Sequence, residues 1–143
     1  MAGKYKNPPI LLVEDNPIDI DLTLRAFKKR NLTNSILVAR DGEEAVNYID
    51  IWDKGAQTPL VILLDLKLPK VDGLEVLKII KEHPKYTTIP VVVLTSSSDS
   101  KDIERAYKLG ANSYIVKPVD FNKFVEVASQ IEIYWNAINE PMK

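Results

Sequence analysis

Five polar side chains follow apolar runs of the sequence: Glu14, Asp15, Asp65, Thr95 and Lys117. Carboxylates brought within a few ångströms of one another repel and raise each other's pKa, unless a cation or a proton relieves them. Hard oxygen ligands of this kind suit Mg²⁺. A lysine and a hydroxyl that face the same spot suit the oxygens of a phosphoryl group. The residue types therefore predict a site for metal-assisted phosphoryl chemistry.

Each of these residues also has an ordinary structural explanation. Glu14 and Asp15 could begin a helix, where the dipole favours acidic groups. Thr95 could be a strand residue or a helix cap, and Lys117 could be a solvated surface charge. Taken singly, these explanations are the better ones. Taken jointly, the position of each residue at the end of a predicted strand favours a shared site.

The apolar runs predict five strands. The strongest is 60–64, where five consecutive apolar residues are typical of a strand buried on both faces of a parallel sheet. The other strands are expected at 10–13, 35–39, 89–94 and 113–116. In open α/β sheets the functional crevice lies beyond the carboxyl ends of the strands, which is where Asp65 would lie.

Apolar residues at helical spacing predict a helix after each strand. The first is expected over 18–29, with an apolar face formed by Ile18, Leu22, Leu24, Ala26 and Phe27, and with Asn31 as its stop. The others are expected around 45–55, 74–82, 99–109 and 120–138. Strand and helix thus alternate five times with short connections. This pattern predicts an α/β fold, a doubly wound parallel sheet with helices on both faces.

Composition excludes several classes of protein. Nineteen basic and twenty acidic residues leave a formal charge of −1, which gives no electrostatic footprint for nucleic acid or an anionic membrane. The absence of cysteine excludes disulfides, thiolate metal sites and cysteine nucleophiles. No signal peptide and no run of the ~20 apolar residues that a membrane helix needs are present. We expect a cytoplasmic single domain over 1–143, with a core of about 8–139 and no output domain.

Four segments of the chain resemble response-regulator receiver domains of two-component signalling: LLVEDN (11–16), LDLKLPKVDG (64–73), VLTS (93–96) and YIVKP (114–118). The resemblance covers nearly the whole chain. It is strongest to stand-alone regulators associated with bacterial phytochrome-type kinases, through IPVVVLT (89–95), Phe121, Tyr134 and Trp135. It implies the flavodoxin-like receiver fold with strand order 2-1-3-4-5.

The resemblance also implies roles for the site residues. Asp65 would be the phosphoacceptor, which attacks the phosphorus of a phosphohistidine on a sensor histidine kinase or a histidine phosphotransfer protein. Mg²⁺ would be held by Asp15, Asp65 and the backbone carbonyl of Lys67, with Glu14 acting mainly through a bound water. Lys117 would pair with the phosphoryl oxygens. A cis peptide before Pro118 would aim Lys117 inward.

Two further residues would form the switch. The hydroxyl of Thr95 would move to bond a phosphoryl oxygen, and Tyr114 would swing into the vacated space. The face made by the fourth helix, the fifth strand and the fifth helix would change for partner binding or phosphorelay. Lys67 and Ser97 lie where the family tunes hydrolysis of the phosphoryl group, and His83 is expected at a helix end. The only catalysis implied is Mg²⁺-dependent self-phosphorylation and autodephosphorylation, so no other enzyme activity is expected.

The residues also bear on three other functions. A phosphatase with an aspartyl-phosphate intermediate typically has a second Asp two residues after the first, where this chain has Lys67. A flavodoxin-like cofactor binder needs a phosphate loop after the first strand, where Glu14 and Asp15 would repel phosphate. A receiver-like scaffold that works without phosphorylation stays open as the alternative.

The last predicted helix carries more apolar residues than one buried stripe requires. One apolar seam consists of Phe124, Ala128, Ile131, Trp135 and Ile138. The apolar residues off this seam are Phe121, Val125, Val127, Ile133 and Tyr134. A broad core contact would explain this surplus. A homodimer or partner surface on this helix would explain it equally well.

Overall fold

A computed structural model describes residues 8–139 of the chain. Its sheet has five parallel strands in the order β2-β1-β3-β4-β5. The strands are β1 (Ile10–Val13), β2 (Ile36–Ala39), β3 (Val61–Leu64), β4 (Val91–Thr95) and β5 (Ser113–Val116). The helices are α1 (Pro17–Lys29), α2 (Gly42–Asp53), α3 (Gly73–Glu82), α4 (Ser100–Lys108) and α5 (Phe121–Asn139). The predicted doubly wound fold and its strand order are confirmed.

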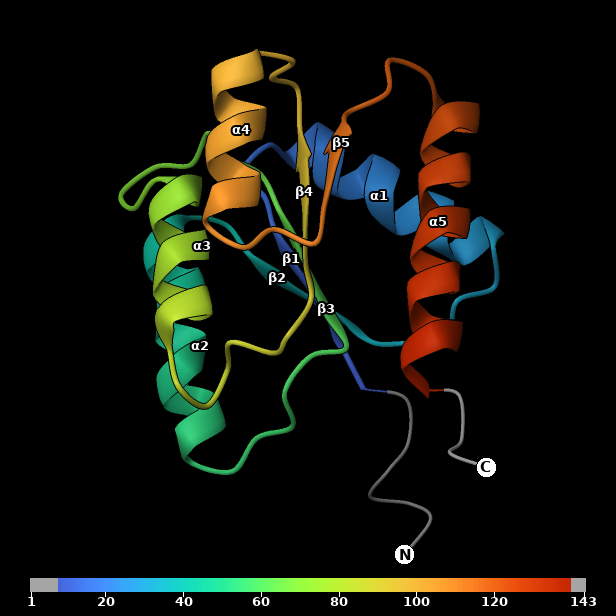
Figure 1. Ribbon diagram of the computed structural model, residues 1–143. Helices are drawn as coiled ribbons and strands as arrows, with labels where there is room; N and C mark the ends of the chain where they lie inside the picture. Colours follow the sequence, from blue (N-terminus) through green and yellow to red (C-terminus); the bar gives the residue numbers. More distant parts are fainter. Residues whose placement is uncertain (1–7, 140–143) are drawn as a thin grey trace, which may run out of the picture.

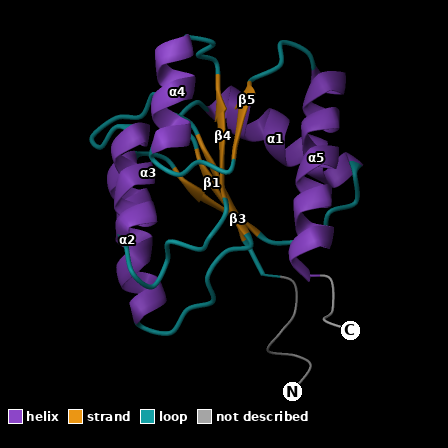
Figure 2. Cartoon of the chain, viewed as in Figure 1, coloured by secondary structure: helices purple, strands orange, loops and turns teal. Residues whose placement is uncertain are grey.

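The helices cover both faces of the sheet. In Figure 1, α1 and α5 lie on one side, and α2, α3 and α4 lie on the other. Figure 2 shows the strands as a single layer between them. Alternate residues of β1 serve the two sides: Leu11 and Val13 pack toward α2 and α3, whereas Ile10 and Leu12 pack toward α1 and α5. The two cores meet at a sheet whose central strands are fully buried.

Local chemistry sets the ends of the helices. Pro17 opens α1, and the Asn16 side chain accepts hydrogen bonds from the backbone N–H groups of Ile18 and Asp19 at 2.8 and 3.3 Å. Asn31 follows the helix with a positive φ of 60°, a conformation that asparagine tolerates well. Asp99 caps α4 by accepting from the N–H of Lys101 at 2.8 Å. The caps Asn16 and Asp99 thus begin α1 and α4 at the carboxyl edge of the sheet.

Two details differ from the predicted elements. Ile18 was expected on the apolar face of α1, but 69% of its surface is exposed. Leu24 is also exposed, whereas Ala26 and Phe27 are buried as predicted, together with Ile20 and Thr23. In addition, β4 begins at Val91 rather than at residue 89, because Pro90 has no N–H for the ladder. The Pro90 carbonyl still accepts the N–H of Ile62 at 2.9 Å.

The final helix packs on α1 through a wide face. Phe124, Ala128 and Ile131 are buried, as the predicted seam requires, and so is the off-seam Val127. Arg30 pairs with Glu132 at 2.7 Å and ties the end of α1 to α5. A broad core contact therefore explains the part of the helix whose side chains are described. Ile133, Tyr134, Trp135 and Ile138 lie outside the residues whose side chains are described.

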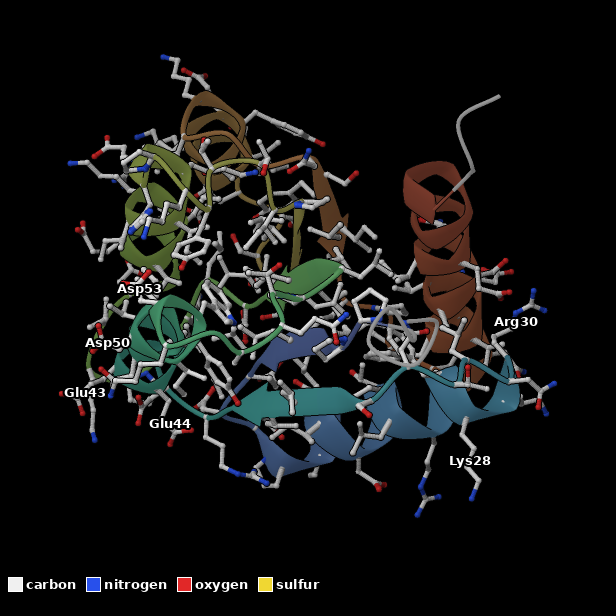
Figure 3. The ribbon with its side chains drawn as sticks, turned by 90° about the horizontal axis from the view of Figure 1, so that it is seen from below. Lys28, Arg30, Glu43, Glu44, Asp50 and Asp53 are labelled. Atoms are coloured by element: carbon white, nitrogen blue, oxygen red, sulfur yellow. The ribbon has the colours of Figure 1, made fainter. Side chains whose placement is uncertain are left out.

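Charged side chains are distributed unevenly over the helices. Figure 3 shows Glu43, Glu44, Asp50 and Asp53 around α2, and Lys28 and Arg30 around the far end of α1. These side chains lie on exposed parts of the two helices, where Asp53 accepts the Tyr86 hydroxyl and Arg30 pairs with Glu132. Among the described residues, no helix combines the length and apolar character that crossing a bilayer requires.

Candidate functional site at the carboxyl edge of the sheet

The backbone of the sheet brings the predicted site residues together. Asp65 follows β3, and its N–H bonds to the carbonyl of Val13 in β1 at 3.0 Å. Lys117 follows β5, and its N–H bonds to the carbonyl of Thr95 at 2.7 Å. Because the strands are parallel and in register, the residue after each strand emerges at the same edge. The sequence prediction that these residues share a site is met by their geometry.

The Lys117 ammonium lies at the centre of this site. Its Nζ is 2.7 Å from Glu14 Oε1, 2.8 Å from Asp19 Oδ2 and 3.0 Å from Asp65 Oδ2. The lysine side chain is only 9% exposed. Burial alone would lower the pKa of Lys117, but its hydrogen bonds to Asp19 and Glu14 and the charge of Asp65 hold that pKa above its ordinary value. The lysine therefore stays charged in the folded protein, with one N–H for each carboxylate.

Asp19 was not predicted from the sequence to belong to this site. An acidic residue in the first turn of a helix is normally explained by the helix dipole, and that explanation hid its second role. The position of Asp19 in the chain was the signal that could have revealed this role. Helix α1 starts four residues after β1 ends, so its first turn must lie beside the residues that end β1.

Glu14 is buried and carries an unusual pKa. Only 2% of its surface is exposed. Burial raises the pKa of Glu14 from 4.5 to about 7, the hydrogen bond from Lys117 opposes this rise, and the charge of Asp65 adds to it. The N–H of Asn16 also donates to Glu14 Oε2 at 3.2 Å. In this arrangement Glu14 takes up a proton near neutral pH, and a second cation would displace that proton.

Three carboxylates at this edge fit a divalent cation. Oxygens of Glu14, Asp15 and Asp65 all lie within 4.8 Å of one another. Asp15 is exposed and forms no ion pair with any described residue. Lys117 supplies a single positive charge to a site with four carboxylates, so negative charge is left over on the side of Asp15. Hard oxygens with uncompensated charge are the donors that Mg²⁺ prefers.

Lys67 follows Asp65 in the same turn. Its side chain is exposed. Its N–H points back to Asp65 Oδ1, at 3.4 Å. The ligand role predicted for the Lys67 carbonyl stays a prediction.

The residues predicted to form the switch converge on Ser97. Thr95 is fully buried, and its hydroxyl accepts a long hydrogen bond from the N–H of Ser97 at 3.5 Å. The Tyr114 hydroxyl donates to the Ser97 carbonyl at 2.9 Å. The Ser97 hydroxyl donates to Asp102 in α4 at 2.7 Å. Burial raises the pKa of the Tyr114 hydroxyl, which keeps it a donor. One loop residue thus connects Thr95, Tyr114 and α4.

The cis peptide predicted before Pro118 is wrong, because the described residues contain no cis bond. The physical reason is local. The trans form of an X-Pro bond is favoured by about 0.5–1 kcal/mol, and Lys117 reaches all three carboxylates from the trans backbone.

His83 lies at the opposite end of the sheet, where it ends α3 and packs on Tyr86 with ring centroids 4.6 Å apart. Its predicted place at a helix end is confirmed.

The comparison with known families agrees with this geometry. Residues 10–129 match the response regulator receiver domain. The chain belongs to that family. Receiver domains act in two-component signalling, are phosphorylated by sensor histidine kinases, and bind Mg²⁺ or Mn²⁺ at an acidic pocket.

Several receiver proteins are similar over most of the chain. The probable methanogenesis regulatory protein FilR2 of Methanothrix harundinacea is 44% identical, over 88% of this chain and 82% of its own. The response regulator Rcp1 of Synechocystis is 38% identical, over 90% of each chain. The phosphorylated cyanobacterial phytochrome response regulator RcpA has a TM-score of 0.84 at 38% identity, covering 95% of this chain and 97% of its own.

These similarities bear on the site as well as the fold. Rcp1 has also been solved in a Mn²⁺-bound form, with a TM-score of 0.80 at 34% identity, over 94% of this chain and 97% of its own. The acidic group of Glu14, Asp15 and Asp65 in this receiver domain is consistent with a metal of that kind. The resemblance to the receiver family stated from the sequence is therefore confirmed.

Proposed function

We propose that this receiver domain is a phosphorylation switch in which Asp65 accepts a phosphoryl group from a phosphohistidine. The donor would be a sensor histidine kinase or a histidine phosphotransfer protein. The observation that carries the proposal is the position of the Asp65 carboxylate. It lies 3.0 Å from the Lys117 ammonium and within the group of three carboxylates that fit a divalent cation.

In the proposed reaction, an oxygen of Asp65 forms a bond to phosphorus while the bond from phosphorus to the donor imidazole breaks. The imidazole nitrogen keeps the electron pair of the broken bond. Lys117 donates to the oxygens of the transferred group, since its ammonium already points at the Asp65 carboxylate. A bound Mg²⁺, held by Glu14, Asp15 and Asp65, would reduce the repulsion between the carboxylate and the phosphoryl oxygens.

The same site would release the phosphoryl group by hydrolysis. Water attacks phosphorus, the bond to the Asp65 oxygen breaks, and inorganic phosphate leaves. We propose no reaction on any separate substrate. Mg²⁺-dependent self-phosphorylation and autodephosphorylation would be the only catalysis.

The proposed switch runs through Ser97. Phosphorylation adds about −1.5 to −2 charge at the site, which favours any donor that can turn toward it. If the Thr95 hydroxyl turns toward a phosphoryl oxygen, its contact with the Ser97 N–H is lost. Ser97 also holds Tyr114 and Asp102, so the face of α4, β5 and α5 would change with it. That face would be read by a partner protein or used in a phosphorelay.

The partner is proposed from the relatives. RcpA is a cyanobacterial phytochrome response regulator, which supports a phytochrome-type kinase as the donor. FilR2 is described instead as a probable methanogenesis regulatory protein. Transfer from a purified phytochrome-type kinase within seconds, against no transfer from an unrelated histidine kinase, would support the first assignment.

A homodimer through the last helix remains a separate proposal. It is supported by the apolar residues of that helix beyond the buried Phe124, Ala128 and Ile131. Light scattering over a dilution series, with and without a phosphodonor, would test it. A monomer at every concentration in both conditions would contradict it.

The proposed chemistry is tested by intact mass spectrometry with Mg²⁺ and acetyl phosphate. The wild type should gain the mass of one phosphoryl group, and Asp65→Asn should not. Asp72→Asn is the matched control, because Asp72 is an exposed carboxylate in the loop after Asp65 that makes no capping hydrogen bond. It should gain the adduct. A wild type that takes up no phosphoryl group would favour the phosphorylation-independent scaffold instead.

A further inference from the structure

Lys117 has three N–H groups, and in this structure all three are directed at carboxylates. Two of these carboxylates, Glu14 and Asp65, belong to the group that fits a divalent cation. Asp19 does not belong to that group. When a metal takes up Glu14 and Asp65, Asp19 therefore still has Lys117 as its cation.

Asp19 is held firmly in this position. It lies in the first turn of α1, where its N–H bonds to the Asn16 side chain and its carbonyl accepts the Thr23 hydroxyl at 2.8 Å. The other partner comes from a more exposed segment: after Lys117, Val119 is 98% exposed. The ion pair thus joins a fixed helical turn to the exposed loop that begins α5, across 98 positions of the sequence.

The charge of Asp19 also lies close to the proposed phosphoacceptor. Asp19 Oδ2 and Asp65 Oδ2 contact the same Lys117 nitrogen at 2.8 and 3.0 Å. The separation of the two oxygens therefore cannot exceed the sum of these two distances. At such a separation a unit charge changes the affinity for an anion several-fold, even when water screens it well. Among the described residues, no cation other than Lys117 pairs with Asp19, so a phosphoryl group on Asp65 would meet a negative charge that this shared lysine alone balances.

We propose that Asp19 competes with the phosphoryl group for Lys117 and so lowers the affinity of the site for that group, without being a ligand of the metal. This inference rests on the proposed function. It assigns Asp19 as a positioning residue: it acts through Lys117 and sets how readily the site holds a phosphoryl group.

The test uses beryllium fluoride as the phosphoryl analogue, titrated at saturating Mg²⁺ into the full chain and followed by ¹⁹F NMR. Asp19→Asn should bind the analogue about threefold or more tightly than the wild type. Asp21→Asn is the matched control. It removes the same charge from the same helix, but the one cation that pairs with Asp21 in the described part of the chain is the exposed Arg25, so the affinity should stay unchanged.

A second measurement separates this effect from a structural one. Mg²⁺ affinity without the analogue should stay the same or fall in Asp19→Asn, because removing a nearby negative charge cannot strengthen cation binding. Local loosening of α1 would instead weaken the binding of Mg²⁺ and of beryllium fluoride together. Thermal unfolding without metal should show Asp19→Asn folded, and Asp19→Ser, which also removes the charge, should repeat its result. If neither variant folds, Asp19 is a structural residue and the inference fails.

The remaining outcomes are distinct. If the wild type binds the analogue and Asp19→Asn binds it equally or more weakly, the inference is overturned and the proposed function stands. If the wild type does not bind the analogue at all, the proposed function fails and the inference fails with it.

Discussion

Two partly buried lysines lie at opposite ends of the sheet, and they have different kinds of hydrogen-bond acceptor. At the amino end, Lys81 donates to the backbone carbonyls of Thr87 and Ile89 at 3.1 and 2.7 Å. At the carboxyl end, Lys117 donates to three carboxylates. Among the described residues, no carboxylate pairs with Lys81. Burial lowers the pKa of Lys81, whereas the partners of Lys117 outweigh burial and raise its pKa.

The comparison separates structural burial from functional burial. Lys81 satisfies carbonyls of the loop that leads into β4, so its contacts are complete within the fold. Lys117 faces more negative charge than it can neutralise, so the fold leaves that site in need of a further cation. A buried lysine by itself indicates little about function. The charge that remains around it after pairing indicates much more.

The largest expected effect comes from removing the Lys117 charge. Lys117→Met should lower the free energy of unfolding without metal by about 3–5 kcal/mol, because it leaves buried carboxylates facing one another. It should also abolish the phosphoryl adduct. Urea unfolding with and without Mg²⁺ checks this, and Mg²⁺ should restore part of the loss. A variant as stable as the wild type in both conditions would contradict this reading of the site.

The next effect is a pH dependence from Glu14. Its pKa is about 7 in the folded protein against an ordinary 4.5, so between these values the folded state holds a proton that the unfolded state has released. The stability that Glu14 contributes without metal should therefore fall as pH rises from about 4.5 to about 7, by on the order of 1–3 kcal/mol. A comparison of the unfolding free energies of the wild type and Glu14→Gln over this pH range isolates the contribution of Glu14.

The same proton should couple to metal binding. Mg²⁺ must displace it, so the apparent affinity of the wild type for Mg²⁺ should rise as pH increases toward and past about 7. Glu14→Gln should lose that part of the pH dependence. Calorimetric titrations in buffers of different ionisation enthalpy would show the released proton. An equal pH dependence in both proteins would assign the proton to another group.

A smaller effect is expected at Lys81. Lys81→Met should cost about 1–2 kcal/mol, because it leaves the Thr87 and Ile89 carbonyls without their donor. The phosphoryl adduct should be unchanged, since these contacts lie at the opposite edge from Asp65. Urea unfolding and intact mass check the two halves of this prediction. Loss of the adduct in a folded Lys81→Met protein would remove the distinction between the two lysines.

The smallest effect provides the baseline. Lys108 pairs with Glu104 on the surface of α4, with 74% and 68% of the two side chains exposed. Lys108→Ala should change the free energy of unfolding by no more than about 0.5 kcal/mol. The adduct should be unchanged as well. A larger loss of stability would show that exposed pairs on α4 matter more than their geometry suggests.

The comparison also shows what the sequence could and could not predict. Asp65, Thr95 and Lys117 were predictable because each follows an apolar run, and parallel strands deliver such residues to one edge. Asp19 was not, because its helix position had a sufficient local explanation. Ile18 was misplaced because periodicity finds an apolar face but not where the sheet beneath it ends. The contacts of Lys81 depend on loop geometry, which no sequence pattern encodes.

Ser97 connects its neighbours in a way that bears on how such a switch diversifies. Its links to Thr95 and Tyr114 are made by its backbone N–H and carbonyl, whereas its side chain donates to Asp102 and accepts the N–H of Asp99 at the start of α4. Any residue with a backbone N–H can therefore preserve the first two, and only proline would remove the donor. A substitution at position 97 would therefore alter the contacts with the start of α4, while the backbone links to Thr95 and Tyr114 would persist.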